Sequence, residues 1–219
     1  MMKKKLLVII FILFTGITMG QINEAGVFLG GSNYIGDIGR TNWIYPNSYA
    51  VGAVYKWNMH PRYSIRANYT YSKIIGDDAQ SNNSFRKYRD LNFSNSIHEL
   101  VVGIEYHFFK YSLSKIGYTN TPYILLEAGV VNYGTFDSGR TYNFTMPFGV
   151  GYKMKLAHNI GIGFETSFRY TFKDDIDGYP FDENSETVQI NPNDNDWYVF
   201  TGITLVFAFG REGCYTGKF

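Results

Sequence analysis

The chain has 219 residues, of which 18% are aromatic and 23 are Gly, and a formal net charge of +1. This balanced charge lacks the basic excess typical of nucleic-acid-binding proteins, so no nucleic-acid partner is expected. After residue 20, no apolar run is long enough for a membrane-spanning helix. Enrichment in Tyr and Gly without long apolar runs is typical of strands with two unlike faces, in a membrane barrel or a soluble sandwich.

The first twenty residues have the parts of an export signal. Residues 1–5 are basic, residues 6–14 are apolar, and residues 18–20 end in a small residue. An uncleaved anchor is the alternative, but the apolar segment is short for a membrane span. The predicted organisation is a signal peptide at residues 1–20, a β-barrel at residues 21–209 and a periplasmic tail at residues 210–219.

Eight segments of the mature chain alternate in the period-two manner of β-strands. The last is the clearest, because aromatic residues stand at both ends of one face while Gly202, Thr204 and Ala208 occupy the other. Segments of eleven to fourteen residues exceed the usual strand of soluble proteins and are long enough to cross a bilayer when tilted. We predict strands at residues 24–34, 49–59, 62–74, 98–109, 122–133, 142–155, 159–172 and 196–209, and no capped helix.

The connections between these segments differ in length. Residues 59–62 and 155–159 form tight turns, whereas residues 36–48, 75–97 and 173–195 are long and polar. In outer-membrane barrels the short turns face the periplasm and the long loops face outward. An even number of strands then places both termini in the periplasm. Two connections fit less well, since residues 110–121 are long for a periplasmic turn and residues 134–141 are short for an outer loop.

One face of the predicted strands is aliphatic and almost free of charge, as in Val102, Ile104 and Leu126. Aromatic residues stand at both ends of this face, which is the distribution that two lipid interfaces favour. Those at the periplasmic ends are Trp57, Tyr63, Phe108, Tyr152, Phe207 and Phe209, and those at the outer ends are Tyr49, Tyr71, Phe144, Tyr170, Phe172 and Trp197.

The opposite face carries charges of both signs among Gly, Ser, Thr and Asn. A soluble sandwich would place these charges in solvent, whereas an eight-stranded barrel would enclose them in an interior only wide enough for side chains. Enclosed charges must pair, because an unpaired buried charge costs several kcal/mol. We therefore predict an eight-stranded antiparallel up-and-down transmembrane barrel with a plugged polar lumen. Its charge network comprises Glu24, Lys56, Arg66, Glu99, Glu105, Glu127, Lys153, Glu165 and Arg169.

The sequence contains little that points to catalysis, so no enzyme, cofactor or metal is predicted. His98 with Glu99 and Ser96 is the one combination similar to a lipid-modifying site, but neighbouring strand residues point to opposite faces. Residues 173–178 resemble the start of a calcium loop, yet Lys173 occupies the first ligand position. The single cysteine, Cys214, lies beyond the last strand and is either an idle thiol or half of an intermolecular disulfide.

Several stretches resemble the PorG family, the outer-membrane barrels of the type IX secretion system. The most distinctive begins at Gly26 and reads GVFLGGSNYIGDIG. Shorter similarities, in chain order, are residues 61–68, 76–78, 98–100 and 121–124. The resemblance implies a non-enzymatic barrel that associates with a periplasmic ring of the lipoprotein PorK and its partner PorN. It also implies a use for Cys214, as a disulfide bridge to the ring lipoprotein.

These observations lead to two hypotheses of different classes. In the first, the barrel lies in outer-membrane lipid and contacts the periplasmic ring through residues 110–121 and the tail that carries Cys214. In the second, it is a stand-alone barrel that acts through its outer loops in adhesion or surface binding. Deleting residues 174–195 distinguishes them, because the first hypothesis predicts that secretion survives.

Overall fold

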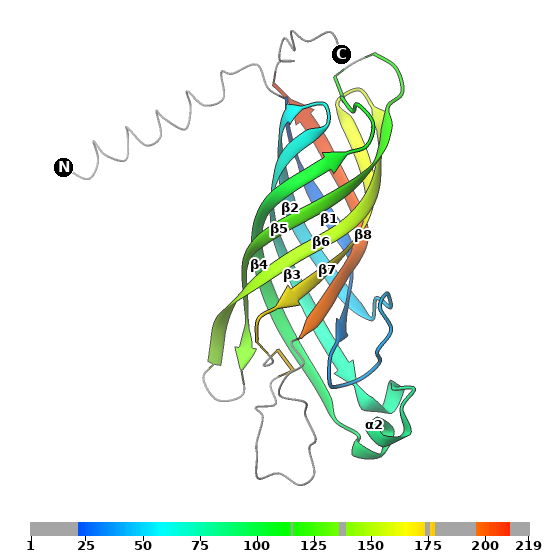
Figure 1. Ribbon diagram of the computed structural model, residues 1–219, viewed down its shortest axis with the longest axis vertical. Coiled ribbons are helices and arrows are strands. Elements are labelled where there is room, and N and C mark those ends of the chain that lie inside the picture. The colour runs from blue at the N-terminus through cyan, green and yellow to red at the C-terminus, as the bar shows by residue number, and fades with distance from the viewer. Residues whose placement is uncertain (1–21, 115, 136–138, 174–175, 178–195, 211–219) are drawn as a thin grey trace, which may run out of the picture.

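In the computed structural model, eight antiparallel strands form one closed barrel in sequence order (Figure 1). The structure describes residues 22–114, 116–135, 139–173, 176–177 and 196–210. The predicted fold class is confirmed, and the alternative of two stacked sheets is wrong. The strands are β1 (Ile22–Ile35), β2 (Ser48–His60), β3 (Tyr63–Asp77), β4 (Asn92–His107), β5 (Asn120–Thr135), β6 (Gly139–Ala157), β7 (Ile160–Thr171) and β8 (Trp197–Phe209).

The barrel closes at a seam between its first and last strands. The register at this seam runs from Asn23 opposite Phe209 to Ile35 opposite Trp197, so all thirteen residues of β8 pair with β1. Every strand thus has two hydrogen-bonded neighbours, and no open sheet edge remains among the described strands. The start of β1 and the end of β8 lie at the same end of the barrel as the tight turns after His60 and Ala157. We call this the turn end and the opposite one the loop end.

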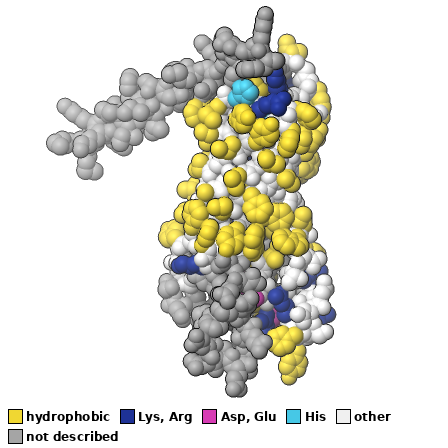
Figure 2. Space-filling view, in the orientation of Figure 1, with side chains coloured by type: hydrophobic (Ala, Val, Ile, Leu, Met, Phe, Trp, Pro, Cys, Tyr) yellow, Lys and Arg dark blue, Asp and Glu magenta, His cyan; other side chains and the backbone are white. Residues whose placement is uncertain are grey.

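The outer wall is apolar, as the alternation predicted. Leu100, Ile104 and Leu126 are more than half exposed, although they are aliphatic. Figure 2 shows hydrophobic side chains over the wall, with Lys and Arg near its two ends. Aromatic rings contact one another near both ends of the wall, for example Tyr63 with Tyr106 at the turn end and Tyr170 with Trp197 at the loop end. Both are cross-strand pairs, which stabilise the sheet directly.

Six of the eight strands are longer than predicted, above all at the loop end, whereas β7 and β8 are slightly shorter. Strand β4 begins at Asn92 instead of residue 98, because it continues to pair with β3 as far as Asp77. Beyond this hairpin the prediction of no helix is wrong. A 3-10 turn, η2 (Asp78–Gln80), leads to a short helix, α2 (Ser84–Arg89), whose first turn is capped by the side chain of Asn83. A helix this short has too few turns to produce a periodic signal. No helix among the described residues has the length and apolarity needed to cross a membrane.

Large side chains fill the lumen because glycines on neighbouring strands leave room for them. A Cβ at Gly151 would lie 2.3 Å from the ring of Tyr123, and one at Gly161 would lie 2.8 Å from the hydroxyl of Tyr111. Both aromatic side chains are buried inside the barrel. The interior is therefore a packed core and not a channel.

Candidate functional site

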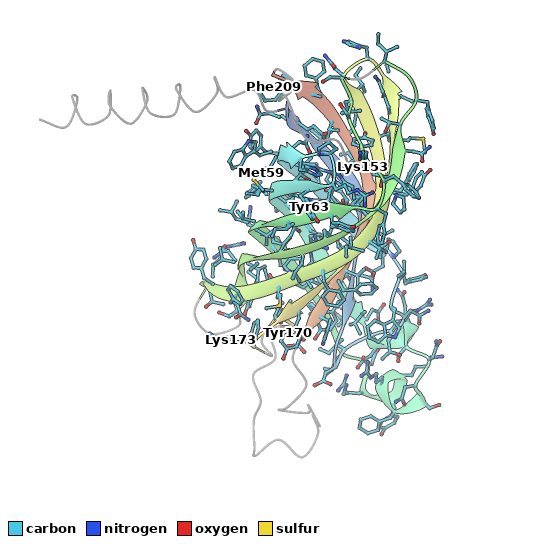
Figure 3. The ribbon with its side chains drawn as sticks, turned by 45° about the horizontal axis from the view of Figure 1, so that its top comes forward. Met59, Tyr63, Lys153, Tyr170, Lys173 and Phe209 are labelled. Carbon is cyan, nitrogen blue, oxygen red and sulfur yellow. The ribbon has the colours of Figure 1, made fainter. Side chains whose placement is uncertain are left out.

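The carboxylate of Glu105 is the centre of a buried ionic network in the half of the lumen nearer the turn end. Its oxygens accept from the ammonium groups of Lys56 at 2.8 Å and Lys153 at 2.6 Å. The imidazole Nε2 of His107 lies 2.9 Å from the same carboxylate. These side chains come from β2, β4 and β6, and Lys153 is labelled within the barrel in Figure 3. The network therefore links strands that are not neighbours in the sheet.

Arg66 connects this centre to the rest of the lumen. Its guanidinium donates two hydrogen bonds of 2.8 Å to Glu165, the fork geometry that makes such pairs strong. It also lies 3.3 Å from Glu105 and 3.3 Å from Glu127. The hydroxyl of Tyr123 donates to Glu165 at 2.7 Å. Arg66 is thus the shared partner of three carboxylates from three strands.

A second, smaller ionic group lies nearer the loop end. Arg169 is 3.2 Å from both oxygens of Glu99, and the hydroxyl of Tyr198 donates to the same carboxylate. The guanidinium of Arg169 also lies 3.9 Å above the ring of Phe200, where cation–π attraction holds it. Glu24 forms no ion pair with a described member of either group and accepts from the amide of Asn58 at 2.9 Å. All nine predicted lumen charges are buried, and eight of them take part in ion pairs.

An apolar cluster closes the lumen at the loop end. Ile74, Ile97, Val131 and Tyr133 contribute fully buried side chains from β3, β4 and β5, and Ile176 joins them from the connection between β7 and β8. Tyr34 donates a hydrogen bond to Asp196 beside this cluster. The Asp196 carboxylate also accepts from the backbone N–H of Ile176 at 2.9 Å, which holds that residue in the mouth of the barrel.

The connection between β4 and β5 closes the turn end. Tyr111 and Leu113 from this connection pack inside the barrel against Val54, Val206 and Ala208. The Lys153 ammonium lies 4.4 Å above the Tyr111 ring. Burial raises the pKa of the Tyr111 hydroxyl, and the nearby charges of Glu24 and Glu105 raise it further. The connection between β4 and β5 is long because it reaches back into the lumen and plugs it.

The same connection exposes apolar side chains outside the plug. Phe109, Ile116 and Tyr118 are more than half exposed, and Leu156 at the end of β6 is exposed as well. Backbone hydrogen bonds fix both flanks of the connection, from Tyr111 N–H to Pro61 O at 3.0 Å and from Lys155 N–H to Thr119 O at 2.9 Å. We call Phe109, Ile116, Tyr118 and Leu156 the turn-end patch.

The charge around the turn-end patch has one sign. Among the described residues at this end, the Asp, Glu, Lys, Arg and His side chains that reach the surface are all basic or imidazole. They are His60, Arg62, Lys110, Lys155 and His158. No described carboxylate there is exposed, since Glu24 is buried. The turn end therefore offers an apolar surface within a basic rim.

Three further predictions concern Cys214, a lipid-modifying site at His98 and Glu99, and metal binding. Cys214 lies outside the described residues. His98 and Glu99 point to opposite faces, as predicted: the His98 ring is 2.7 Å from the Tyr69 hydroxyl on the outer wall, whereas Glu99 is inside. The residues of a lipid-modifying site are thus not brought together. Within the described ranges, no group of three His, Cys, Asp or Glu side chains could hold a metal ion.

The uncharged large side chains of the lumen were not among the predicted residues. Besides the charges and small polar residues that were predicted, aromatic and aliphatic side chains of the same parity line the inner face. Tyr123, Tyr198, Ile97 and Val131 all alternate in phase with the inward residues of their strands. The inward orientation of these four residues could have been predicted from the alternation. The insertion of Tyr111 and Leu113 into the lumen could not, because the connection that carries them has no periodic pattern.

Comparisons with solved structures found barrels of low sequence identity. Ail, the attachment invasion locus protein of Yersinia pestis, is 9% identical, with a TM-score of 0.41, 86% of this chain covered and 100% of Ail. Neisserial surface protein A is 8% identical, with a TM-score of 0.46, 85% of this chain covered and 96% of that one. A major outer membrane protein from Thermus thermophilus is 12% identical, with a TM-score of 0.45, 86% of this chain covered and 99% of that one.

Sequence comparison with curated proteins gave no match. One family model does match, over residues 3–218, which is nearly the whole chain. The chain therefore belongs to the family described as a domain of unknown function, DUF6089.

Proposed function

We propose that this protein is a non-enzymatic outer-membrane barrel that anchors a periplasmic assembly, the PorK and PorN ring of a type IX secretion system. The observation that carries the proposal is the turn end. There, a connection longer than a turn seals the lumen and presents the turn-end patch within a basic rim. A sealed barrel conducts nothing, so its work is done at its ends.

The outer wall supports the membrane location. Aliphatic side chains such as Leu126 and Val150 are exposed in the middle of the wall, and aromatic rings gather towards both ends. In water this wall would be a very large exposed apolar surface, which soluble monomers rarely tolerate. In lipid it is stable, and the aromatic rings then lie at the two interfaces. The turn end then faces the periplasm, and the loop end faces outward.

The turn-end patch supports a protein partner. Phe109, Ile116 and Tyr118 are exposed on a connection whose backbone is fixed on both sides. A fixed apolar patch with a polar rim has the anatomy of a protein interface. The partner that fits is a periplasmic protein with an apolar contact surface bordered by carboxylates. The resemblance of residues 26–39 to PorG supports the ring as that partner, and Cys214 is the candidate for a covalent bridge to it.

Non-reducing electrophoresis of outer membranes tests the covalent bridge. We expect a band larger than the monomer that contains the ring lipoprotein and disappears on reduction or in a Cys214→Ser variant. Heat-dependent migration of that variant would show that the barrel still folds. A monomer-sized band with a free Cys214 thiol would contradict the bridge.

Co-purification of the ring lipoprotein tests the patch separately, in the Cys214→Ser background. We expect Ile116→Glu to lower recovery about tenfold, because it places a charge in the centre of an apolar contact. Tyr88→Glu is the matched control, since Tyr88 is also highly exposed but lies on α2 at the other end. Equal recovery with both variants would contradict docking at the turn end.

The second candidate function is a stand-alone barrel that acts through its outer loops. One observation favours it: the loop end carries the ordered elements η2 and α2 instead of plain turns. Deleting residues 174–195 separates the two functions. Under the ring anchor, secretion and surface binding both survive the deletion, whereas under the alternative surface binding is lost and secretion is unchanged.

A further inference from the structure

A pocket of about 340 Å³ opens at the loop end of the barrel, far from the turn-end patch. It lies between the connection of residues 36–47 and the end of β3 with η2, and its lining includes Arg40, Asn42, Tyr45 and Asp77. A volume of this size accommodates a ligand of one or two sugar rings. Because the pocket is at the opposite end, a ligand there would bind independently of the periplasmic anchor.

One wall of the pocket is held by a clamp of two arginines and a buried carboxylate. Asp78 accepts from Arg89 at 2.8 Å and from the backbone N–H of Gly39 at 2.7 Å. Arg86 donates at 3.0 Å to the carbonyl oxygens of both Gly36 and Gly39. Gly39 has a φ of 92°, a conformation that favours glycine. The clamp fixes the connection against α2.

The far side of the same connection is fixed to the barrel. The Asn33 amide donates to the carbonyl oxygens of Asn42 and Trp43 and accepts from the backbone N–H of Tyr45. The Asn47 amide donates to the carbonyl oxygen of Ile75 at 3.1 Å. Residues 36–47 are thus held from both sides, so the pocket exists before any ligand arrives. Such preorganisation lowers the entropic cost of binding.

Several polar groups that face the pocket can form more hydrogen bonds than they form with described residues. Only the Nε of Arg40 donates to a described residue, at 2.7 Å to the carbonyl oxygen of Gln80, so its two Nη groups remain available. The Asp77 oxygens each accept one hydrogen bond, from Ala79 N–H and from the Gln80 amide, and each can accept more. The Asn42 side chain bonds to no described residue and is exposed.

The apolar part of the pocket lining consists of Tyr34, Tyr45, Ile38, Pro46 and Ile75. The Tyr45 ring is 39% exposed and lies 4.6 Å below the Arg40 guanidinium. Arg40 and Asp77 carry opposite charges in the same pocket, so neither a simple anion nor a simple cation is matched to it. A ligand whose neighbouring groups both donate and accept, on a ring with an apolar face, is matched to all four side chains. Sugars have this combination, because each hydroxyl does both and the ring C–H groups stack on aromatic faces.

We propose that this pocket binds a saccharide of one or two rings, through Arg40, Asn42 and Asp77 to its hydroxyls and Tyr45 to its ring. The sugar comes either from a soluble glycan or from the carbohydrate of an outer-membrane glycolipid. Both sources present the same hydroxyl chemistry to the pocket.

The test uses the full mature chain in phospholipid nanodiscs. One arm titrates glucose, mannose, galactose, N-acetylglucosamine, glucuronic acid and the disaccharides lactose and maltose by calorimetry. The other arm compares purified lipopolysaccharide with lipid A, which lacks the outer sugars. We expect binding in at least one arm. In the second arm, we expect lipopolysaccharide to bind more tightly than lipid A. The arm that gives binding identifies the source.

Two variants assign that binding to the pocket. Arg40→Lys keeps the charge but loses the planar fork, and Asp77→Asn keeps the cap of η2 but loses the carboxylate. Each should weaken binding about tenfold, since hydrogen bonds to charged groups are strong. Lys87→Ala, on exposed α2, should change nothing. Absence of binding in both arms, or equal binding by wild type and both folded variants, would overturn the proposal.

Discussion

The two ends of the lumen are sealed in different ways. At the loop end the seal consists mainly of inward side chains of the strands themselves, such as Ile74, Ile97 and Val131. At the turn end Tyr111 and Leu113 belong to a connection that folds back into an opening between the strands. The first seal is part of the wall and forms with it. The second is an insertion, so it can change without dismantling the barrel.

The largest effect is expected between the two seals, at the shared ionic centre. Glu105→Leu should lower the free energy of unfolding by about 3–5 kcal/mol, because it leaves Lys56 and Lys153 buried without their carboxylate. Urea unfolding followed by tryptophan fluorescence measures this. Glu24→Gln is the control, since Glu24 forms no ion pair with a described residue, and a similar loss in both variants would argue against the network.

The loop-end seal should be the more costly of the two to weaken. Ile97→Ala is expected to lower the free energy of unfolding by about 2–5 kcal/mol through the cavity it leaves among rigid strand side chains. Leu113→Ala should cost about 2 kcal/mol or less, because its connection can readjust. The same urea unfolding experiment compares them. A greater loss for Leu113→Ala would reverse the distinction between the seals.

The clamp outside the loop-end seal should act locally. Arg89→Ala removes the partner of Asp78, so residues 36–47 lose one of their attachments to α2. We expect faster trypsin cleavage at Arg40 and a change in global stability of about 0.5 kcal/mol or less, as for a locally unfolding segment. Lys87→Ala is the control, and unchanged cleavage kinetics would mean that the clamp is not what orders the connection.

A small effect of the opposite sign is expected at the Tyr111 hydroxyl within the turn-end plug. This buried oxygen has no hydrogen-bond partner among the described residues. Tyr111→Phe keeps the ring that packs under Lys153 and removes a polar atom that is costly to bury. Stability should be unchanged or higher by about 0.5–1 kcal/mol. A clear loss of stability would show that the hydroxyl bonds to a group outside the described residues.

The sequence predicted the wall better than the ends. The period-two alternation of Leu126 outward and Glu127 inward follows from strand geometry alone, and the closed barrel follows from eight such strands with alternating connection lengths. The partners of each charge could not be predicted. Arg66 and Glu165 are 99 residues apart and meet only because the barrel curves. The turn-end plug and the arginine clamp could not be predicted either, because they depend on single side chains in connections, which have no periodic sequence pattern.

The seam between β1 and β8 has a consequence for how the protein is made. Strand β1 is synthesised before the other seven strands, yet its partner along thirteen paired positions, β8, is synthesised after them. Until β8 arrives, one edge of β1 has unsatisfied backbone groups and is prone to pair with other chains. Closure of the barrel therefore cannot precede the synthesis of β8, and until then the free edge of β1 must be kept from pairing with other chains.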